Sequence, residues 1–245
     1  MKKVVILGAL SGIAIEIERL FAARGAALGL LDINAADIEA LTHDLTVRGA
    51  AVVEAMTLDL AAPVSYDGTL RELSSRLGGI DVLIITYGIL GNQGRAKDDL
   101  EHANAILTTD FVSASLWLLA AAKVVSPGGN IVVFSSVAGD RGRKSNFVYG
   151  AAKGGLAVFA QGLAHDLAET GPHVMIVKPG LVDTPMTADI KKGGPLWASA
   201  KNVARIVVRE IDKKSRTVVY VPWFWRWIML IIRLLPTSIF HRLNL

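Results

Sequence analysis

Short apolar runs recur along the chain and alternate with longer stretches in which apolar residues follow helical spacing. The runs are rich in β-branched residues and fall at 4–7, 28–31, 51–56, 82–85, 131–134, 174–177 and 218–221. Continuous apolar strands are buried on both faces, and strands that alternate with helices form a parallel sheet with right-handed crossovers. The pattern therefore predicts an α/β fold, a doubly wound parallel sheet of about seven strands with helices on both faces.

The length and composition fit one globular domain. No repeat, low-complexity tract or linker divides the 245 residues, so we expect a single Rossmann-type domain over 1–245 with an apolar extension at 222–245. A hydrophobic content of 52% excludes a disordered chain. The absence of cysteine excludes disulfides and thiolate metal sites and fits a reducing cytoplasm. The five histidines lack metal-ligand spacing, so no metal is expected.

The first predicted strand runs directly into a turn of small residues, G-x-x-x-G-x-A at 8–14, and then into an amphipathic helix. Such a turn lets backbone N–H groups and the helix N-terminus approach a pyrophosphate, where the helix dipole also favours negative charge. An ordinary strand-to-helix connection is the alternative. The turn predicts a dinucleotide site with cofactor contacts from Gly8, Ser11, Gly12 and Ile13.

Asp32 ends the second predicted strand, 20 residues after Gly12. A carboxylate there accepts hydrogen bonds from the adenosine ribose hydroxyls and repels a 2′-phosphate. The nearest candidates for an offsetting cation are Ser11 and Ile33, and neither carries charge, so NAD(H) is favoured over NADP(H). Asp59, at the end of the third predicted strand, either contacts the adenine or caps a helix.

Tyr149 and Lys153 are four residues apart at the start of a helix of small residues, so the phenol and the ammonium share one helix face. A nearby cation stabilises phenolate, which lowers the pKa of a tyrosine from about 10 and lets it exchange a proton with a substrate oxygen. Ser136 follows the fifth predicted strand, at the sheet edge where such folds bind ligands. The three residues predict an acid/base site for carbonyl or alcohol chemistry. A plain helix-face pair is the alternative for Tyr149 and Lys153.

With these residues the chain resembles the short-chain dehydrogenase/reductase family over essentially its whole length, through the glycine turn, Asp32, Asp59, Ser136, Tyr149, Lys153 and the segment 179–184. The resemblance implies an NAD(P)-dependent oxidoreductase in which Lys153 also binds the nicotinamide ribose. It implies that the nicotinamide lies along Pro179, Gly180, Val182 and Thr184, with Thr184 near the carboxamide. Family members commonly form dimers or tetramers, so a homodimer or homotetramer is expected.

The sequence departs from the family pattern at three places. Thr86-Tyr87-Gly88 replaces the usual Asn-Ala-Gly after the fourth strand, so the packing around Gly88 on the adenosine side is expected to differ. Ala14 replaces the third glycine of the turn. The family's catalytic asparagine falls at Asp110 by spacing. We expect Asp110 to substitute for that residue, which holds a proton-relay water through a main-chain carbonyl.

A positive cluster of Arg141, Arg143 and Lys144 lies in the loop between Ser136 and Tyr149. Guanidinium groups beside a reaction centre suit a phosphate or carboxylate on the substrate. A solvated surface loop is the alternative. The stretch 186–200 is interpreted as a mobile lid over the substrate.

The segment 222–235 is almost wholly apolar, and the chain from Lys191 onward carries 11 Lys and Arg against 2 Asp and Glu. A helix of this length covers about 20 Å, too short for a hydrocarbon core of about 30 Å. Arg226 and Arg233 share one helical stripe and tryptophans prefer headgroup depth, so the segment suits a membrane interface. An oligomer interface or an apolar lid is the alternative. Two arginines among apolar residues make a poor phosphate track, so nucleic-acid binding is not expected.

Three stretches, 87–91, 141–150 and 234–240, look like the subgroup of the family that reduces decaprenylphosphoryl-2-keto-ribose. That resemblance implies a lipid-linked or phosphorylated keto sugar whose C2 carbonyl is reduced by NADH, in a cytoplasmic protein at the inner face of the membrane. The alternative is a soluble family member that acts on a steroid, ketoacyl or polyol substrate and uses the tail for oligomerisation.

Overall fold

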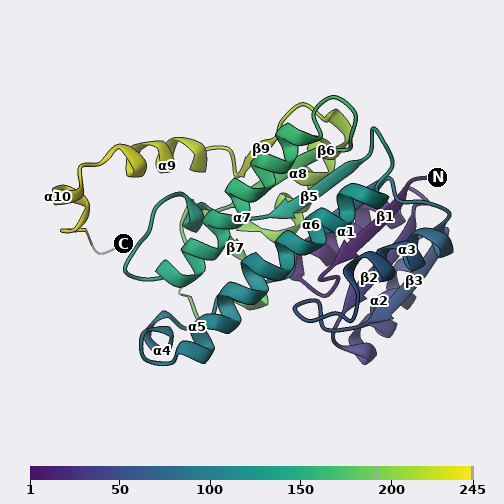
Figure 1. The fold of residues 1–245 in the computed structure, drawn as a ribbon, viewed down its shortest axis with the longest axis horizontal. Coiled ribbons are helices and arrows are strands. Elements are labelled where there is room, and N and C mark those ends of the chain that lie inside the picture. Colours follow the sequence, from purple (N-terminus) through teal and green to yellow (C-terminus); the bar gives the residue numbers. More distant parts are fainter. Residues whose placement is uncertain (191, 244–245) are drawn as a thin grey trace.

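The computed structural model describes residues 1–190 and 192–243. Its main sheet has seven parallel strands in the order β3-β2-β1-β4-β5-β6-β9 (Figure 1). The predicted apolar runs correspond to β1 (Lys3–Leu7), β2 (Ala27–Asp32), β3 (Val52–Thr57), β4 (Val82–Ile85), β5 (Asn130–Phe134), β6 (His173–Pro179) and β9 (Val218–Val221). The prediction of a seven-stranded parallel sheet is confirmed.

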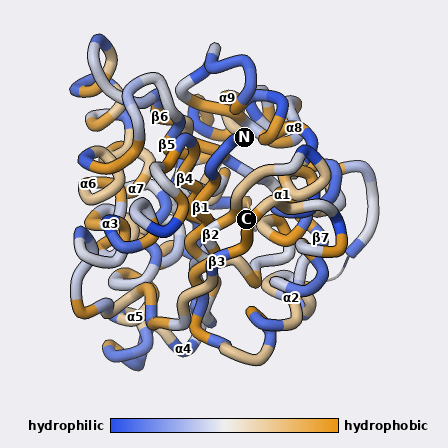
Figure 2. The backbone as a smooth tube through the Cα atoms, turned by 90° about the vertical axis from the view of Figure 1, so that its right-hand side faces the viewer, coloured by the Kyte–Doolittle hydropathy of each residue, from blue (hydrophilic) through white to orange (hydrophobic). Residues whose placement is uncertain are grey.

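Helices cover both faces of the sheet. Side chains alternate along each strand, so Val4 and Ile6 of β1 enter one hydrophobic core and Val5 and Leu7 enter the other. The first core is completed by α1 (Gly12–Ala22), α2 (Ala35–Val47) and α8 (Ala200–Lys213), and the second by α3 (Tyr66–Leu77), α6 (Ala114–Val124) and α7 (Phe147–Asp166). Figure 2 shows the apolar strands running between these two helical layers. The doubly wound architecture is therefore confirmed as well.

The strand order reverses at β1, which has β2 on one side and β4 on the other. In an open parallel sheet such a reversal leaves a crevice at the carboxyl ends of the strands, where ligands bind. The loops after β1, β4, β5 and β6 leave the sheet at this edge and carry the glycine turn, Gly88, Ser136 and Gly180 respectively. The fold thus gathers residues that are far apart in the sequence.

Four helical segments follow one another between β4 and β5, namely α4 (Gln93–Asp98), α5 (Leu100–Leu107), the π-helical turn η1 (Thr108–Ser113) and α6. By length and composition alone, the stretch Leu100–Val124 is apolar enough to cross a membrane, but half of its apolar window is buried within the fold. A core helix passes the same test, and Trp117, Leu118 and Ala121 pack in the second core. The stretch is therefore a layer of the fold.

After β6, a second and smaller sheet forms from β7 (Leu181–Asp183) and β8 (Trp197–Ser199), with the short 3₁₀ turn η3 (Pro185–Thr187) between them. The sequence does not predict β8, because three residues are too few to display a period. Lys191, part of the expected lid, lies outside the described residues. The lid itself stays a prediction.

The C-terminal helices α9 (Trp225–Leu234) and α10 (Thr237–Phe240) extend away from the body of the fold (Figure 1). We call the segment 222–243 the C-terminal arm. It is attached through Trp225 and Met229, which are buried in a cluster with Val137 of the 3₁₀ turn η2 (Val137–Asp140). The helix expected after Pro222 forms from Trp225 onward. Much of the apolar surface of the arm remains exposed, namely Trp223, Trp227, Leu230, Ile231 and Leu234.

Candidate active site

The turn after β1 requires glycine at its first position, because there is no room for a side chain there. Gly8 has a φ of +88°, a conformation that L side chains rarely adopt, and a Cβ there would lie 2.6 Å from the backbone nitrogen of Tyr87. Ser11 is the N-cap of α1, and its hydroxyl accepts from the N–H of Ala14 at 3.3 Å. The remaining N–H groups of the first helical turn have no carbonyl partner within the helix. The turn therefore fits a pyrophosphate group.

Thr86-Tyr87-Gly88, which replaces the usual Asn-Ala-Gly of the family, contacts this turn directly. The Thr86 hydroxyl oxygen is buried 2.9 Å from the carbonyl oxygen of Leu7 and 2.8 Å from that of Gly8. Tyr87 points the other way, and its hydroxyl pairs with the Ser113 hydroxyl at 2.7 Å. Thr86 thus ties the loop after β4 to the start of the glycine turn.

Asp32 ends β2, as predicted, and its carboxylate faces the glycine turn. One oxygen accepts from the backbone N–H of Leu10 at 2.9 Å and the other from that of Ile33 at 2.7 Å. On the opposite side of the turn, a Cβ at Gly12 would lie 3.4 Å from a methyl carbon of Thr184. The structure therefore brings the predicted ribose, pyrophosphate and nicotinamide contacts to one edge of the sheet.

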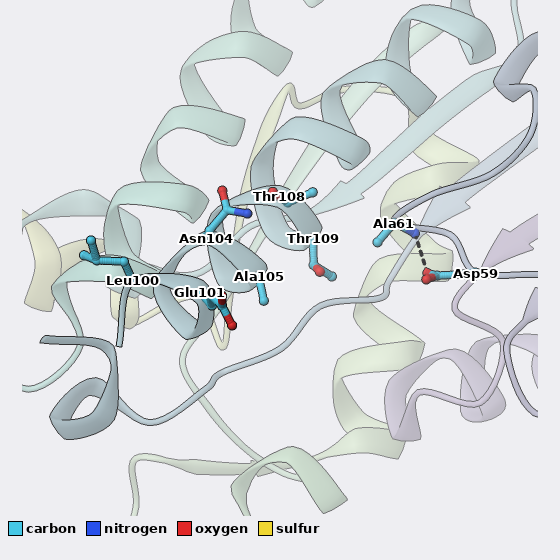
Figure 3. A pocket seen from close by; sticks show the side chains of 8 residues that line it. All are labelled: Asp59, Ala61, Leu100, Glu101, Asn104, Ala105, Thr108 and Thr109. Atoms are coloured by element: carbon cyan, nitrogen blue, oxygen red, sulfur yellow. Dashed lines mark hydrogen bonds between the residues drawn. The ribbon is translucent and has the colours of Figure 1, made fainter. Parts of the chain in front are cut away.

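Asp59 lies two residues beyond β3 at the rim of an open cavity of about 490 Å³ (Figure 3). Its carboxylate accepts from the N–H of Ala61 at 2.8 Å, which closes a local turn. The following helix, α3, is capped by Ser65 instead. Of the two readings of Asp59, helix capping is thus wrong, and adenine contact stays a prediction. The cavity is lined by Asp59, Ala61, Leu100, Glu101, Asn104, Ala105, Thr108 and Thr109.

Ser136, Tyr149 and Lys153 meet beside the carboxyl ends of β5 and β6. The Lys153 ammonium nitrogen lies 5.8 Å from the centroid of the Tyr149 ring, as expected for residues one helical turn apart. The Ser136 hydroxyl lies close enough to the phenol to lower its pKa, and it accepts from the N–H of Ala138 at 3.1 Å. This arrangement places a proton donor, a hydroxyl and a cation together.

The pKa of Tyr149 is set by opposing influences. Burial raises the pKa of the phenol, the Lys153 charge lowers it, the Asp110 carboxylate raises it, and the Ser136 hydroxyl lowers it. The net direction is upward from the usual value. The sequence predicts the sign of the Lys153 effect correctly, but it does not anticipate that burial and Asp110 outweigh it.

Asp110 is fully buried and forms an ion pair with Lys153, with 3.0 Å between a carboxylate oxygen and the ammonium nitrogen. The same oxygen accepts from the N–H of Ile89 at 3.2 Å. Gly88 makes room for this pair, since a Cβ there would lie 2.2 Å from the carboxylate oxygen and 3.0 Å from the Lys153 nitrogen. The side chain of Asp110 thus reaches the site, and the expected role of its main-chain carbonyl in holding a proton-relay water stays a prediction.

The residues of the segment expected along the nicotinamide, 179–184, have different contacts within the fold. Pro179 ends β6, and the N–H of Gly180 donates to the carbonyl of Val221 at 3.0 Å. The Val182 side chain is buried in the first core, so only its backbone is free to face a ligand. Their cofactor contacts stay predictions.

Three comparisons place the chain among known proteins. A family model described as short chain dehydrogenase matches residues 2–194. The chain belongs to the short-chain dehydrogenase family. It is 38% identical over 242 residues to an uncharacterized oxidoreductase of Mycobacterium tuberculosis. The alignment covers 98% of this chain and 96% of the relative. The prediction of a short-chain oxidoreductase is confirmed.

Two further relatives carry more specific names. The chain is 31% identical over 212 residues to a 3-oxoacyl-[acyl-carrier-protein] reductase of Bos taurus, covering 83% of this chain and 88% of that enzyme. A solved short chain dehydrogenase from Burkholderia cenocepacia J2315 in complex with NADP is similar with a TM-score of 0.80 and 26% identity, over 89% of this chain and 95% of that one. These similarities support the fold and the oxidoreductase class.

Arg141 has a structural partner in this short-chain dehydrogenase. Its guanidinium donates to the carbonyls of Ile232 and Leu235, the latter at 2.7 Å, and lies 3.8 Å from the centroid of the Phe240 ring. Carbonyls at a helix C-terminus lack helical partners, and the helix dipole favours a cation there. The expectation that Arg141 binds a substrate anion is therefore corrected, because its charge is used at the end of α9.

The other two basic residues of this loop, Arg143 and Lys144, differ in exposure. Arg143 is partly buried, and its Nε has no acceptor among the described residues. Burial lowers the pKa of the Arg143 guanidinium, whereas the charge of Asp140 raises it. Lys144 is exposed. Substrate contact by Arg143 and Lys144 stays a prediction.

A buried network behind the site was not predicted. The Lys178 ammonium forms an ion pair with the Asp140 carboxylate, which also accepts from the Tyr220 hydroxyl at 2.8 Å. Lys178 directly precedes Pro179, and Asp140 is four residues after Ser136, so the network joins two loops of the site. Lys178 stands inside an apolar strand, and a buried lysine almost always has a partner. That position alone could have indicated a buried ion pair.

Proposed function

We propose that this short-chain dehydrogenase reduces a ketone to an alcohol with NADH, with Tyr149 as the proton donor. The observation that carries the proposal is the cluster of Ser136, Tyr149 and Lys153 at the carboxyl edge of the sheet, next to the glycine turn. A phenol held against a hydroxyl and a cation is suited to protonating a carbonyl oxygen. Bound NADH supplies the hydride.

The site residues have separate roles in this proposal. Gly12 and Ile13 offer backbone N–H groups to the pyrophosphate at the start of α1, and Gly8 and Ser11 contact the cofactor as parts of the turn that leads into it. The Ser136 hydroxyl holds the substrate oxygen, Tyr149 gives it a proton, and Lys153 binds the nicotinamide ribose. The other proposed cofactor contacts are Asp32, Asp59, Gly88, Pro179, Gly180, Val182 and Thr184.

Asp32 supports NADH over NADPH. Its carboxylate is held in place by the N–H groups of Leu10 and Ile33, so it stays at the end of β2. A fixed negative charge accepts ribose hydroxyls and repels a 2′-phosphate. The Burkholderia relative was solved in complex with NADP, so the fold alone does not set the preference, and we assign it here to Asp32.

We propose a lipid-linked or phosphorylated keto sugar as the substrate, as for reductases of decaprenylphosphoryl-2-keto-ribose. Two features support an amphiphilic substrate. Arg143 and Lys144 offer positive charge in the loop before Tyr149, which suits a phosphate. The C-terminal arm exposes an apolar surface attached to the same loop through Arg141. A phosphate and an acyl or prenyl chain would therefore find complementary groups on one side of the protein.

A second candidate is a soluble ketoacyl reductase, with steroid and polyol ketones as further options. The similarity to the bovine 3-oxoacyl-[acyl-carrier-protein] reductase favours it. In this version the arm is an oligomer contact. A homodimer or homotetramer also has support outside the arm, because η1, α6 and α7 expose the apolar side chains of Val112, Leu116, Leu119 and Val158.

Contact with the inner face of the membrane is a proposal that rests on the arm. Tryptophans prefer headgroup depth, and exposed arginines attract anionic lipid. Trp223 and Trp227 are 70% and 54% exposed, and Arg226 lies beside them. A peripheral location would bring the active-site loop close to a lipid-linked substrate.

The proposal is tested by mixing the purified protein and NADH with either a polyprenyl-phosphate 2-keto-pentose or a 3-oxoacyl thioester. NADH oxidation is followed by absorbance, and the alcohol product is identified by mass spectrometry. Turnover of the keto sugar with little turnover of the thioester supports the first candidate, and the reverse supports the second. If neither ketone is reduced above the blank, both candidates are wrong.

A further inference from the structure

The buried ion pair between Asp110 and Lys153 is unlike the environment that a neutral asparagine would give this site. The side chains of Lys153 and Asp110 are only 5% and 0% exposed. Lys153 donates a second hydrogen bond to the carbonyl of Phe134 at 3.2 Å. An ammonium has three N–H donors, so one donor remains after Asp110 and Phe134 are satisfied.

Backbone geometry shows that the chain is built around this pair. Asp110 lies in the π-helical turn η1, and such turns shift the register of a helix and frequently occur at functional sites. Its carboxylate also accepts the N–H of Ile89, so the loop after β4 supports it from the other side. The lack of a side chain at Gly88 leaves the space in which carboxylate and ammonium meet. The turn η1 and the loop after β4 therefore converge to hold one carboxylate beside Lys153 of α7.

The phenol of Tyr149 is influenced by few charges. The charged groups that face it are Lys153 on its own helix and Asp110 on η1. The described side chains that pack against it from α4, α5 and η2 are apolar, namely Ala96, Ile106 and Ala138. In a dry site a carboxylate next to the ammonium cancels much of its field. Lys153 therefore stabilises the Tyr149 phenolate less than an unpaired ammonium would.

We propose that Asp110 is a positioning residue that neutralises Lys153 and so keeps Tyr149 protonated, which suits the site to carbonyl reduction rather than alcohol oxidation. The inference rests on the proposed role of Tyr149 as the acid. In reduction, hydride from NADH forms the new C–H bond at the carbonyl carbon, and the carbonyl oxygen takes the Tyr149 proton. NADH becomes NAD⁺, the ketone becomes an alcohol, and the phenolate regains a proton from water. Oxidation would require the phenolate at the start, which Asp110 disfavours.

The test is a titration of the cofactor-free protein labelled with ¹³C at the Cζ of its four tyrosines, followed by NMR. The Tyr149 signal is assigned by its loss in Tyr149→Phe. In Asp110→Asn we expect the Tyr149 midpoint to fall by about one pH unit, a tenfold loss of proton affinity. The alkaline limb of kcat/KM for ketone reduction should move in the same direction.

Asp140→Asn is the matched control, since Asp140 is also a buried carboxylate paired with a lysine, Lys178. It should leave the Tyr149 midpoint in place. An unchanged or higher midpoint in Asp110→Asn, or an equal fall in Asp140→Asn, overturns the inference. Should Asp110→Asn not fold, the native protein still decides, because a Tyr149 midpoint below about 10, the value for free tyrosine, contradicts the inference.

The proposed function and this inference fail in different ways. A shifted midpoint without turnover of any ketone refutes the function and leaves the effect of Asp110 on the phenol intact. Turnover of a ketone with an unshifted midpoint refutes the inference alone.

Discussion

The Trp225 indole packs so closely against Gly180 that a Cβ at residue 180 would lie 1.9 Å from its Nε1. Trp225 is the first residue of α9, and Gly180 lies in the segment predicted to follow the nicotinamide. The indole is buried, and its N–H has no acceptor among the described residues. Together with the bonds from Arg141 to the end of α9, this contact fixes the C-terminal arm to two loops of the active site.

Gly180→Ala should therefore release the start of the arm. The new methyl cannot share the space of the indole, and overpacking of this kind costs about 1–3 kcal/mol of the free energy of unfolding. We expect a lower midpoint in urea and a red shift of tryptophan fluorescence. Gly162→Ala is the control, because a Cβ on that exposed position of α7 meets nothing within 4 Å. That substitution should preserve or raise stability. Equal midpoints for Gly180→Ala and the parent protein would show that the indole moves freely.

Tyr149→Phe should abolish proton transfer while leaving the cofactor site intact. The ring and its packing remain, but the substrate oxygen loses its acid. We expect kcat/KM for the ketone to fall by about 10²–10⁴-fold with little change in the Kd for NADH, measured by fluorescence titration. Tyr66→Phe is the matched control, since Tyr66 packs on the Trp117 ring and is not among the residues proposed to touch substrate or cofactor, so most activity should remain. Parental activity in Tyr149→Phe would refute the proposed function.

The fold was predictable because its signals are local and repeated. Every strand of the main sheet contains a run rich in apolar residues, and in β4 and β9 the run is the whole strand, so these two are predicted at the residues where they occur. The strand β8 and the π-helical turn η1 were not predicted. The first is too short for a period, and the second differs from an α-helix by one residue of register, which the hydrophobic pattern does not report.

The site was predictable where one residue type is tied to one backbone position. Gly8, Ser136 and the Tyr149 and Lys153 pair lie where spacing and strand ends put them. The partners of the charged residues were not predictable, because they come from distant elements. Nothing within ten residues of Arg141 indicates that it caps α9, some 90 residues later.

Glu18 was also missed, and it makes the stability of the protein depend on pH. The side chain is buried in α1 and neither carboxylate oxygen has a partner among the described residues. Burial raises the pKa of Glu18 well above its usual value, and the nearby Asp32 charge raises it further, whereas Arg19 lowers it. The folded state therefore keeps a proton that the unfolded state releases above about pH 4.5. Stability must fall as the pH rises from there towards the folded pKa.

Glu18→Met should remove this loss. We expect the variant to have a higher unfolding free energy than the parent protein. The difference should be small near pH 4.5 and grow towards pH 8, by about 1.4 kcal/mol for each unit by which folding raises the pKa of Glu18. Urea denaturation at several pH values measures it. Glu39→Met, on the exposed side of α2, is the control and should show no such growth. A gain that is independent of pH would mean that Glu18 is ionised in the folded protein.

Asp32→Ala should weaken the preference for NADH. Without the carboxylate, the adenosine ribose loses a hydrogen-bond acceptor and a 2′-phosphate loses a repelling charge. We expect the ratio of kcat/KM for NADH to that for NADPH to fall at least about tenfold, which corresponds to 1.4 kcal/mol. Asp37→Ala, on the exposed first turn of α2, should leave the ratio unchanged. A parental protein that already prefers NADPH would contradict the proposed role of Asp32.

The exposed face of α9 gives the last prediction. Trp227 and Ile231 are four residues apart and are 54% and 63% exposed, so they lie together on the outer side of the arm. If this face enters anionic vesicles, replacing both residues with serine should reduce co-flotation at least about tenfold, because each buried apolar side chain contributes about 1.5–3 kcal/mol. Val158→Ser is the matched control, since Val158 is 71% exposed on α7.

Salt and size separate lipid binding from self-association in the same samples. Vesicle binding through Arg226 and Arg233 should weaken as salt rises, because exposed charges are screened over about 10 Å at 0.1 M. An oligomer held by the apolar face should persist at that salt and dissociate in the double variant, which light scattering detects. A protein that stays at the bottom of the gradient but becomes smaller on substitution would assign the arm to a second copy of the chain, and the soluble alternative would then hold.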